Sequence, residues 1–382
     1  MVRAHCVRVD GEPPLALRVR LIEDAAGLLD LESEWNGLLQ RSPADCPFLT
    51  WEWVTTWWSL YRRDSELHLL EARDENGQLV GLAPLKRGRK WLNGLWPVSI
   101  VEFIGHGGDV NPEYLDFVVQ LERSADVLPA FADALCDDSR VDGVDLRPLA
   151  AHSAALATLR HRSSGKWHVG VLPDAACPVL SLPATYESFL SGCSRNYRKK
   201  TREAERRCAR DLGARLRSSS TREELDRDMA SLVQLHRKRW TGRSSAFRTP
   251  EYIEFHRRVS QLFLSRGWTR MFSLEGAAGV VASLYCYCYN KVYYYYQSGR
   301  DPEFSRNRVG LVLMHMAVRE AIREGAVSFD FLRGHEPYKY HWARDHRLNL
   351  RVVCWRSAAL ALAHRLHGLV GAVGARLPGG PV

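Results

Sequence analysis

VSFDFLRGHEPYKYHWA, residues 327–343, is the most informative segment of this chain. It opens with Val327, Phe329 and Phe331 at every second position, a period that predicts a buried strand over 327–332. The pattern breaks at Gly334, and most of the residues that follow are ionisable or aromatic. A rigid strand that ends in such a cluster is a common way to present side chains to a substrate. The alternative is an ordinary strand followed by a polar surface loop.

The composition is that of a globular protein long enough for two domains. The chain has 382 residues, of which 46% are hydrophobic and 25% charged. The formal net charge of +9 favours an anionic ligand, but the basic residues are spread along the chain, so the charge alone does not indicate nucleic acid binding. The cysteines form no Cys-x-x-Cys pair, which argues against a structural zinc site or a disulfide framework and for reduced thiols in a cytoplasm.

The sequence gives no sign of export or of a membrane span. The first residues, MVRAHCVRVDGEPP, contain charges and no apolar run, so we expect a disordered lead and no signal peptide. No window reaches the roughly eighteen apolar residues that a membrane helix needs.

Strand and helix patterns alternate in both halves. We predict a disordered lead over 1–14, a first domain over 15–172, a linker over 173–183, a second domain over 184–356, and a C-terminal helix and tail over 357–382. In the first domain we expect one helix over 25–39 and a β-hairpin at Asn76-Gly77. Strands outnumber crossover helices, so the predicted fold class is α/β (α+β), with mixed sheets flanked by helices.

The second half also contains a candidate anion site. An aromatic strand, VYYYYQSG, ends at Gly299, and the loop after it contains Arg300, Arg306 and Arg308. A helix is expected to follow and to end at Gly325. Arginines and free backbone N–H groups at a helix N-terminus suit a pyrophosphate. The alternative is a solvated surface loop.

Several segments resemble one enzyme family. FDFLRGHEPYKYHWA, the preceding YYYYQSGRDP and GLVLM, and the upstream LHRKRWTGRSSAF are similar to the CelD-like acyltransferases of the GNAT superfamily, which are related to the Fem peptidyltransferases. SRNYRKKTREAERR and PFLTWEWVTTWW also resemble segments of that family. The resemblance covers roughly residues 47–355 and is most specific in its C-terminal motifs. It implies two tandem GNAT-like domains, with the acyl donor held in the second.

The resemblance also implies where the donor lies. Its pantetheine arm would lie between the 292–298 and 327–332 strands, which splay apart, and its pyrophosphate at the 306–310 turn. The implied donor-binding residues are Gln297, Ser298, Gly299, Arg306, Arg308, Val309 and Gly310. The turn departs from the usual GNAT pattern, because Asn307 replaces an arginine or glutamine and Val312 replaces a small residue. The implied co-substrate is acyl-CoA, as acetyl-CoA or a longer chain, with no permanently bound cofactor.

Amide formation needs a group that takes the amine proton and groups that stabilise the oxyanion and the leaving thiolate. Asp330 and Glu336 are rival candidates for the base, with His236 as a further alternative. Tyr338 and Lys339 are candidate proton donors. The candidate substrate-binding residues are Arg333, Arg239, Trp240, Arg195, Asn196, Lys199 and Trp342.

These candidates also have structural interpretations. Asp330 is equally suited to a buried ion pair with Arg333 or Lys339. His236 and Trp240 are four residues apart and are equally suited to helix packing. The basic helix after the linker is equally suited to a solvated surface face. The sequence contains no Gly-x-Ser-x-Gly elbow and no clustered metal ligands, so it indicates neither a serine nucleophile of that type nor a metal.

We therefore expect a cytoplasmic N-acyltransferase that moves an acyl group from coenzyme A to an amine of a small molecule, sugar or peptide by direct attack. One alternative is Fem-like transfer from aminoacyl-tRNA, which the basic helix favours and the lack of a sustained heptad run disfavours. Another is a non-catalytic saccharide-binding protein, which the tryptophan content suits. The sequence leaves the acceptor, the acyl chain length and the oligomeric state open.

Overall fold

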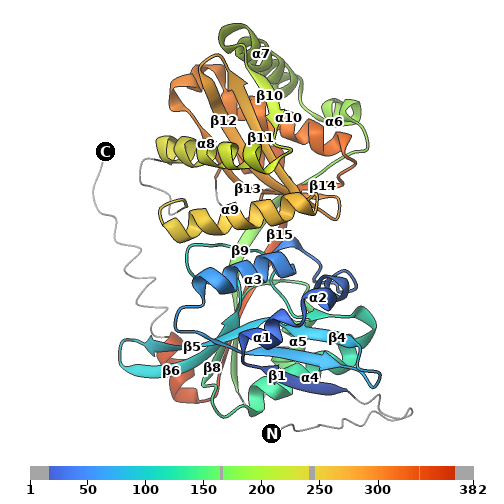
Figure 1. The fold of residues 1–382 in the computed structure, drawn as a ribbon, viewed down its shortest axis with the longest axis vertical. Helices are drawn as coiled ribbons and strands as arrows, with labels where there is room; N and C mark the ends of the chain where they lie inside the picture. The colour runs from blue at the N-terminus through green and yellow to red at the C-terminus, as the bar shows by residue number, and fades with distance from the viewer. Residues whose placement is uncertain (1–16, 164–166, 241–245, 335, 366–382) are drawn as a thin grey trace. The chain divides into compact units, whose positions relative to one another are not determined.

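The computed structural model describes residues 17–163, 167–240, 246–334 and 336–365. The predicted lead over 1–14 and the tail from 366 on lie outside these residues. The chain divides into two compact units, and each combines helices with strands, as the predicted fold class requires (Figure 1). The first takes in the described residues of 1–107, 111–175 and 348–382, and the second those of 108–110 and 176–347. Among the described residues, no helix is both long and apolar enough to cross a membrane.

The first unit begins at the N-terminal end of the described chain. Its elements are β1 (Arg18–Ile22), α1 (Ala25–Leu29), α2 (Glu32–Leu39), η1 (Pro47–Leu49), α3 (Trp51–Tyr61), β2 (Glu66–Leu67), β3 (Leu69–Arg73), β4 (Leu79–Ala83), β5 (Leu85–Leu92), β6 (Trp96–Phe103), β7 (Val118–Val119), η2 (Leu121–Arg123), α4 (Ser124–Asp137), β8 (Gly143–Ala150) and α5 (Ala154–Ser163). Parts of β9 (His168–Ser181) and β15 (Asp345–Trp355) also belong to it.

Most strand pairs of this unit are antiparallel. One sheet has the order β1-β3-β4-β7, and the strands β15-β8-β6-β5-β2 are also neighbours in that order. β6 and β8 are parallel. The predicted hairpin at Asn76-Gly77 is confirmed, since β3 and β4 pair antiparallel across it and Gly77 has the positive φ of 80° that favours glycine.

Two local predictions were wrong. The single helix expected over 25–39 is broken into α1 and α2 after Leu29. Leu28, Leu31, Trp35 and Leu38 are all buried, so the apolar spacing continues across the break and does not reveal it. The stretch expected as a linker over 173–183 lies mostly in β9.

The boundary between the units after residue 175 lies in the predicted 173–183 stretch, but the C-terminal residues group otherwise than the sequence suggested. The sequence placed residues up to 356 in the second domain, whereas the residues from 348 on group with the first unit. The reason is that β15 pairs antiparallel with β8, from Asn349 opposite Ala150 to Trp355 opposite Gly143.

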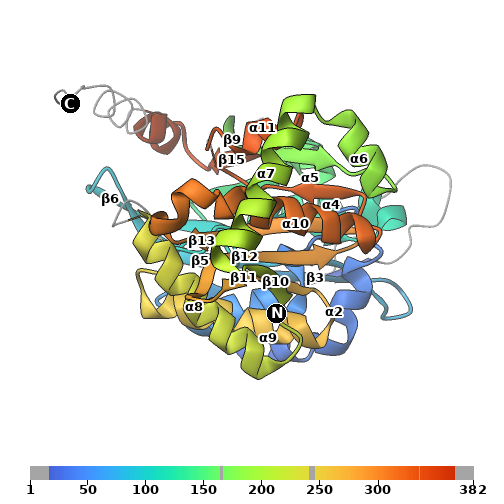
Figure 2. The ribbon, with the colours of Figure 1, turned by 90° about the horizontal axis from the view of Figure 1, so that it is seen from above.

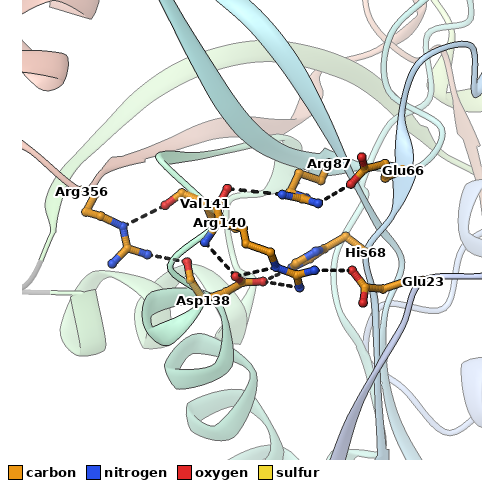
Figure 3. Close-up of polar contacts among 8 residues, drawn as sticks. All are labelled: Glu23, Glu66, His68, Arg87, Asp138, Arg140, Val141 and Arg356. Atoms are coloured by element: carbon orange, nitrogen blue, oxygen red, sulfur yellow. Dashed lines mark hydrogen bonds and ion pairs between the residues drawn. The ribbon is translucent and has the colours of Figure 1, made fainter. Parts of the chain in front are cut away.

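A buried histidine lies in a polar network of the first unit (Figure 3). The His68 side chain is 1% exposed, and its Nε2 lies 4.0 Å from a carboxylate oxygen of Asp138. Asp138 also accepts hydrogen bonds from Arg140, whose guanidinium pairs with Glu23 at 2.6 Å. Burial lowers the pKa of His68 from 6.5 to about 4, with a partly opposing effect of Asp138. The folded protein therefore keeps this imidazole neutral.

We predict that His68 makes the fold sensitive to mild acid. Between pH 6.5 and 4 the unfolded chain binds the proton more readily than the folded chain, so stability falls as the pH falls through this window. Relative to a His68→Gln variant, the wild type should lose about 1.4 kcal/mol of unfolding free energy per pH unit there. Urea unfolding at a series of pH values tests this, with the exposed His161→Gln as the control. A pH-independent difference between wild type and His68→Gln would contradict it.

The second unit contains the segment that opened the sequence analysis. Its elements are the end of β9, α6 (Tyr186–Gly192), α7 (Arg195–Leu212), β10 (Arg215–Ser218), α8 (Arg222–Trp240), α9 (Pro250–Ser265), β11 (Thr269–Gly276), β12 (Gly279–Tyr289), β13 (Val292–Arg300), η3 (Pro302–Asn307), α10 (Val309–Arg323), β14 (Ser328–Asp330), α11 (Lys339–Trp342) and the start of β15.

The sheet of this unit has helices on both faces. Its strand order is β10-β11-β12-β13-β14-β9, in which β13 and β14 are parallel and the other pairs antiparallel. Figure 2 shows α8 and α9 on one face and α7 and α10 on the other. α8 packs on β12 and β13, whereas α10 packs on β12 and on α7.

Helix caps explain where these helices begin. A capping box begins α8, since Glu224 N–H donates to Thr221 Oγ1 at 3.2 Å and Thr221 N–H donates to a Glu224 oxygen at 3.3 Å. Thr249 Oγ1 caps α9 by accepting the N–H of Tyr252 at 3.2 Å, and Pro250 lies in the first turn, where its missing N–H costs nothing. These local signals fix the position of α8, which carries candidate site residues.

Candidate active site

The site begins where β13 and β14 separate. These parallel strands pair only at Val292, Tyr293 and Tyr294 of β13, opposite Ser328, Phe329 and Asp330 of β14. Beyond that point β13 continues to Arg300, paired with β12. On the other side of β14, the chain stays paired with β9 for one more residue, since Phe331 N–H donates to Pro178 O at 2.9 Å.

The Asp330 carboxylate ends β14. Its Oδ1 accepts the N–H of Leu332 at 2.8 Å, and its Oδ2 lies 3.5 Å from Arg347. Leu332 has a φ of 53°, in the left-handed region, which a strand cannot contain. The strand is therefore shorter than the 327–332 that the alternation indicated. Asp330 itself is fully buried, and Arg347 lies within ion-pair distance of its carboxylate.

A β-bulge lies on β13 just past the separation. The register with β12 shifts between the pair Tyr285–Gln297 and the pair Cys286–Tyr295, which leaves Tyr296 as the extra residue. Tyr295 is buried and packs against Phe331. Gln297 is directed to α9, where its Nε2 lies 3.3 Å from the hydroxyl of Tyr252.

A chain of polar side chains crosses the place where the strands separate. The hydroxyl oxygens of Tyr338 and Tyr295 lie 2.8 Å apart, and that of Tyr295 lies 2.5 Å from Ser298 Oγ. Arg239 Nη1 donates to the same Ser298 Oγ at 3.2 Å. The guanidinium carbon lies 4.7 Å from the ring centre of Trp240 and 5.9 Å from that of Tyr338. Burial is the main cause that raises the pKa values of Tyr295 and Tyr338, so both phenols stay protonated.

His236 lies next to this chain. It is 3% exposed, and its Nδ1 bonds to the backbone oxygen of Ser298 at 3.1 Å. A carbonyl accepts only, so Nδ1 is the protonated nitrogen and Nε2 has the lone pair. Burial lowers the pKa of His236 below 6.5, with a smaller effect of Arg239 in the same direction, and the imidazole is neutral at pH 7.

Gly299 allows this close approach of α8 to β13. A Cβ at this position would lie 2.6 Å from the backbone nitrogen of His236 and 2.8 Å from Cβ of Leu235. Neither atom belongs to the flexible end of a side chain. Only glycine therefore fits between the strand and the helix that carries His236 and Arg239.

We predict that Gly299→Ala displaces α8 and lowers stability by about 1–3 kcal/mol, because the added methyl group meets helix backbone. Gly192→Ala is the matched control, since a Cβ there meets nothing within 4 Å. Urea unfolding of both variants tests the packing. Equal stability of Gly299→Ala and wild type would show that α8 and β13 are not in this close contact.

Contacts among its own residues stabilise the loop after β14. Lys339 Nζ donates to Arg333 O at 2.6 Å and lies 3.1 Å from the Glu336 carboxylate. Lys339 is only 3% exposed, and Gly334 has a φ of 133°. Of the predicted catalytic residues in this loop, Glu336 and Lys339 thus pair with each other, whereas Tyr338 reaches β13.

The predicted anion turn lies at the N-terminus of α10. Arg308 precedes the helix with a φ of 55°, and the first turn contains no acidic residue. Arg306 and Arg308 are exposed, and Val309 is buried. Gly310 faces Arg300, since a Cβ there would lie 3.2 Å from Arg300 Cδ. Burial lowers the pKa of Arg300, and the nearby Arg239 adds to this effect.

The remaining predicted substrate residues lie away from this chain of contacts. Arg195, Asn196 and Lys199 are exposed on the first turns of α7. Trp342 packs against Tyr197 and His315, with ring centres 5.5 and 6.5 Å away.

Sequence reasoning missed Tyr295 and gave Arg300 only a place in the loop. The bulge at Tyr296 hides Tyr295, because it disrupts the alternation that assigns side chains to the faces of β13. The position of Arg300 as the last residue of β13, facing a glycine in the next helix, was the available signal.

The first unit also contains two parallel strands that separate, but there the chain's own backbone lies along the separated edge. β6 and β8 pair at Ile100–Gly143 and Val101–Val144 and then separate. The fully buried Leu115 pairs with Leu149 beyond that point, so the chain's own backbone lies along β8. The first turn of α4 also contains the acidic Asp126.

Comparison with known proteins identifies the second unit. A family model described as an acetyltransferase (GNAT) domain matches residues 195–340. No curated protein matches the chain. The matched residues include α8, β13, α10 and the loop that carries Tyr338. The chain is thus a transferase with a GNAT acetyltransferase domain.

Solved structures share the fold over both units. FemX is 13% identical with a TM-score of 0.57, and the match covers 84% of this chain and 95% of FemX. A conserved protein of unknown function from Bacteroides thetaiotaomicron VPI-5482 is 11% identical, with a TM-score of 0.53 and coverage of 88% and 99%. The C-terminal DUF2156 domain of a putative lysylphosphatidylglycerol synthetase from Agrobacterium fabrum is 12% identical, with a TM-score of 0.51 and coverage of 89% and 95%. The predicted GNAT acetyltransferase domain is thus confirmed over residues 195–340, and the chain shares the fold of these solved structures over most of its length.

Proposed function

We propose that the chain is an acyl-CoA-dependent N-acyltransferase that forms an amide by direct attack of an amine on the thioester. The observation that carries this proposal is the separation of β13 from β14 next to the N-terminus of α10. Both features lie within the matched GNAT domain. The bond in the product is an amide, and the thiol of coenzyme A leaves.

The donor fits this arrangement by its chemistry. Beyond Tyr294, the edge of β13 no longer pairs with β14, and an extended ligand with amide groups can bond to such an edge. The diphosphate carries the charge that suits the first turn of α10, with Arg300, Arg306 and Arg308 nearby. Asn307 and Val312 depart from the usual motif, and Val312 is fully buried, so this argument depends on the arginines and the helix N-terminus.

Three residues are candidates for the base, and we favour His236 for its charge state and its position. Asp330 is engaged by Leu332 N–H and Arg347, and Glu336 by Lys339. His236 is neutral at pH 7 and lies next to the chain that ends at Tyr338. In this mechanism His236 accepts a proton from the amine, and Tyr338 donates one to the leaving thiolate.

Binding of coenzyme A tests the donor. Acetyl-CoA at a hundredfold excess over its Kd should stabilise the protein by about 2.7 kcal/mol. Calorimetry should find one molecule per chain, because the corresponding pair in the first unit is closed by Leu115. Coenzyme A, longer acyl-CoAs and transfer RNA are the other ligands to compare. Stabilisation by transfer RNA alone would reject the proposal in favour of aminoacyl transfer.

A pair of arginine variants locates the donor. Arg308→Gly should leave stability unchanged or raised, because Arg308 has a positive φ that glycine tolerates. It should weaken acetyl-CoA binding by about 10- to 100-fold, the effect of losing a charged hydrogen-bond partner. Arg63→Gly is the matched control, since Arg63 also has a positive φ (43°) but lies in the first unit. Equal weakening by both variants would exclude a specific phosphate contact.

We predict that His236→Gln lowers kcat by about a hundredfold or more, the usual effect of losing a general base. Because the pKa of His236 is lowered, the wild type should stay active to below pH 6.5 and lose activity as the pH falls further. Glu336→Gln should retain this pH profile. The measurement is kcat against pH with an acceptor from a panel of amino sugars, amino acids and peptides. A profile lost in Glu336→Gln and kept in His236→Gln would assign the base to Glu336.

Fem-like transfer from aminoacyl-tRNA is the second candidate, and one feature favours it. α7 carries eight basic residues, of which most are exposed: Arg195, Arg198, Lys199, Lys200, Arg202, Arg206, Arg207 and Arg210. Arg207 donates to Arg306 O at 2.7 Å, so this helix lies beside the turn before α10. A polyanion is attracted to such a surface.

A cytoplasmic location is part of the same proposal. The cysteines of the described residues are free thiols, and most of them are buried. Reduced thiols of this kind fit a reducing compartment.

A further inference from the structure

The hydrogen bonds of the polar chain at the site run in one donor-to-acceptor order. This order assigns roles to residues that the proposed reaction does not yet use. Its members are Arg239 of α8, Ser298 and Tyr295 of β13, and Tyr338 of the loop before α11. Three segments far apart in sequence thus meet through side-chain hydrogen bonds of 2.5 to 3.2 Å.

Arg239 sets the direction because it only donates. A guanidinium has five N–H donors and no acceptor, so Ser298 Oγ accepts its bond. A nearby cation also turns hydroxyl dipoles so that their hydrogens point away from it. The Ser298 hydrogen then points to Tyr295, and the Tyr295 hydrogen to Tyr338. The hydrogen of Tyr338 is left to point out of the chain.

Such a chain strengthens the last donor. Each hydroxyl that accepts a hydrogen bond becomes a better donor to the next, because neighbouring bonds polarise one another in a low dielectric. Tyr295 is 6% exposed, so water competes little at its position. α8 is held against Gly299, which fixes Arg239 at the start of the chain.

We propose that Arg239, Ser298 and Tyr295 are positioning residues that make Tyr338 the proton donor to the leaving thiolate. The role depends on the proposed acyl transfer. When the tetrahedral intermediate collapses, the bond between carbonyl carbon and sulfur breaks and sulfur keeps the electron pair. Tyr338 gives its phenolic proton to sulfur, and the Tyr295 hydroxyl donates to the phenolate oxygen that remains. Solvent returns a proton to Tyr338, and the proton that the base took from the amine is released to solvent.

The kinetic test uses acetyl-CoA as donor and hydroxylamine as acceptor, with thiol release as the readout. We expect Tyr295→Phe and Ser298→Ala to lower kcat by about 10-fold each, with the KM for acetyl-CoA unchanged. Ser298→Thr keeps a hydroxyl and should keep activity. Adding Tyr295→Phe to Tyr338→Phe should cause no further loss, because the first residue acts through the second. Tyr293→Phe, two residues earlier on the same strand and stacked on Phe329, is the matched control.

A spectroscopic measurement tests the chain without turnover. With tyrosines labelled at the carbon that bears the hydroxyl, Tyr295→Phe and Tyr338→Phe assign the two resonances. We expect Ser298→Ala to shift both resonances, because the loss passes along the chain. A shift of Tyr295 without a shift of Tyr338, or additive losses in the double variant, would overturn the proposal. Coupled shifts without any thiol release from wild type would instead reject the acyl transfer, and the donor role with it.

Discussion

The hydrogen bond between the Asp330 carboxylate and the N–H of Leu332 is the contact on which the site depends. It closes a turn at the end of β14 and holds Leu332 in the left-handed region. The Asp330 carboxylate is fully buried and also pairs with Arg347, so removing it would leave the buried N–H of Leu332 without this acceptor. If β14 continued in register, its backbone would pair with β13 at the level of Tyr295. The loop that carries Tyr338 reaches Tyr295 because the strand ends first.

Each unit contains one pair of parallel strands that separates, and the two units fill the separated edge differently. In the second unit β14 turns away after Asp330, and the next residue stays bonded to β9. In the first unit β8 continues, and Leu115 pairs with it beyond the point where β6 ends. An unpaired edge is costly unless something covers it, so each unit needs a partner for that backbone. The first unit supplies its own chain, and in the proposed function the second unit receives the donor.

Local signals in the sequence were enough to predict most elements of the second unit. The capping box at Thr221 and the Thr249-Pro250 pair each depend on neighbours within a few residues, and α8 and α9 begin at these signals. The same reasoning found Tyr338, His236 and Arg239, because a family motif carried them. It did not find the end of β14 or the role of Tyr295. These depend on a side-chain bond to backbone and on a bulge opposite β12, which no spacing in the sequence encodes.

Repulsion between the arginines of the site favours the binding of an anion. Arg239 and Arg300 are close enough for their charges to oppose each other, and this effect adds to the desolvation that already lowers the pKa of Arg300. Arg300 is half-buried, and its Nη1 donates a hydrogen bond to the neutral Ser305 hydroxyl at 2.9 Å. Two guanidinium groups held by β13 and α8 cannot move far apart, because Gly299 keeps the strand and the helix in contact. An anion at the N-terminus of α10 would relieve that repulsion, whereas a neutral ligand would not. The rigid contact at Gly299 thus connects the packing of the domain to the charge of the ligand that it is proposed to bind.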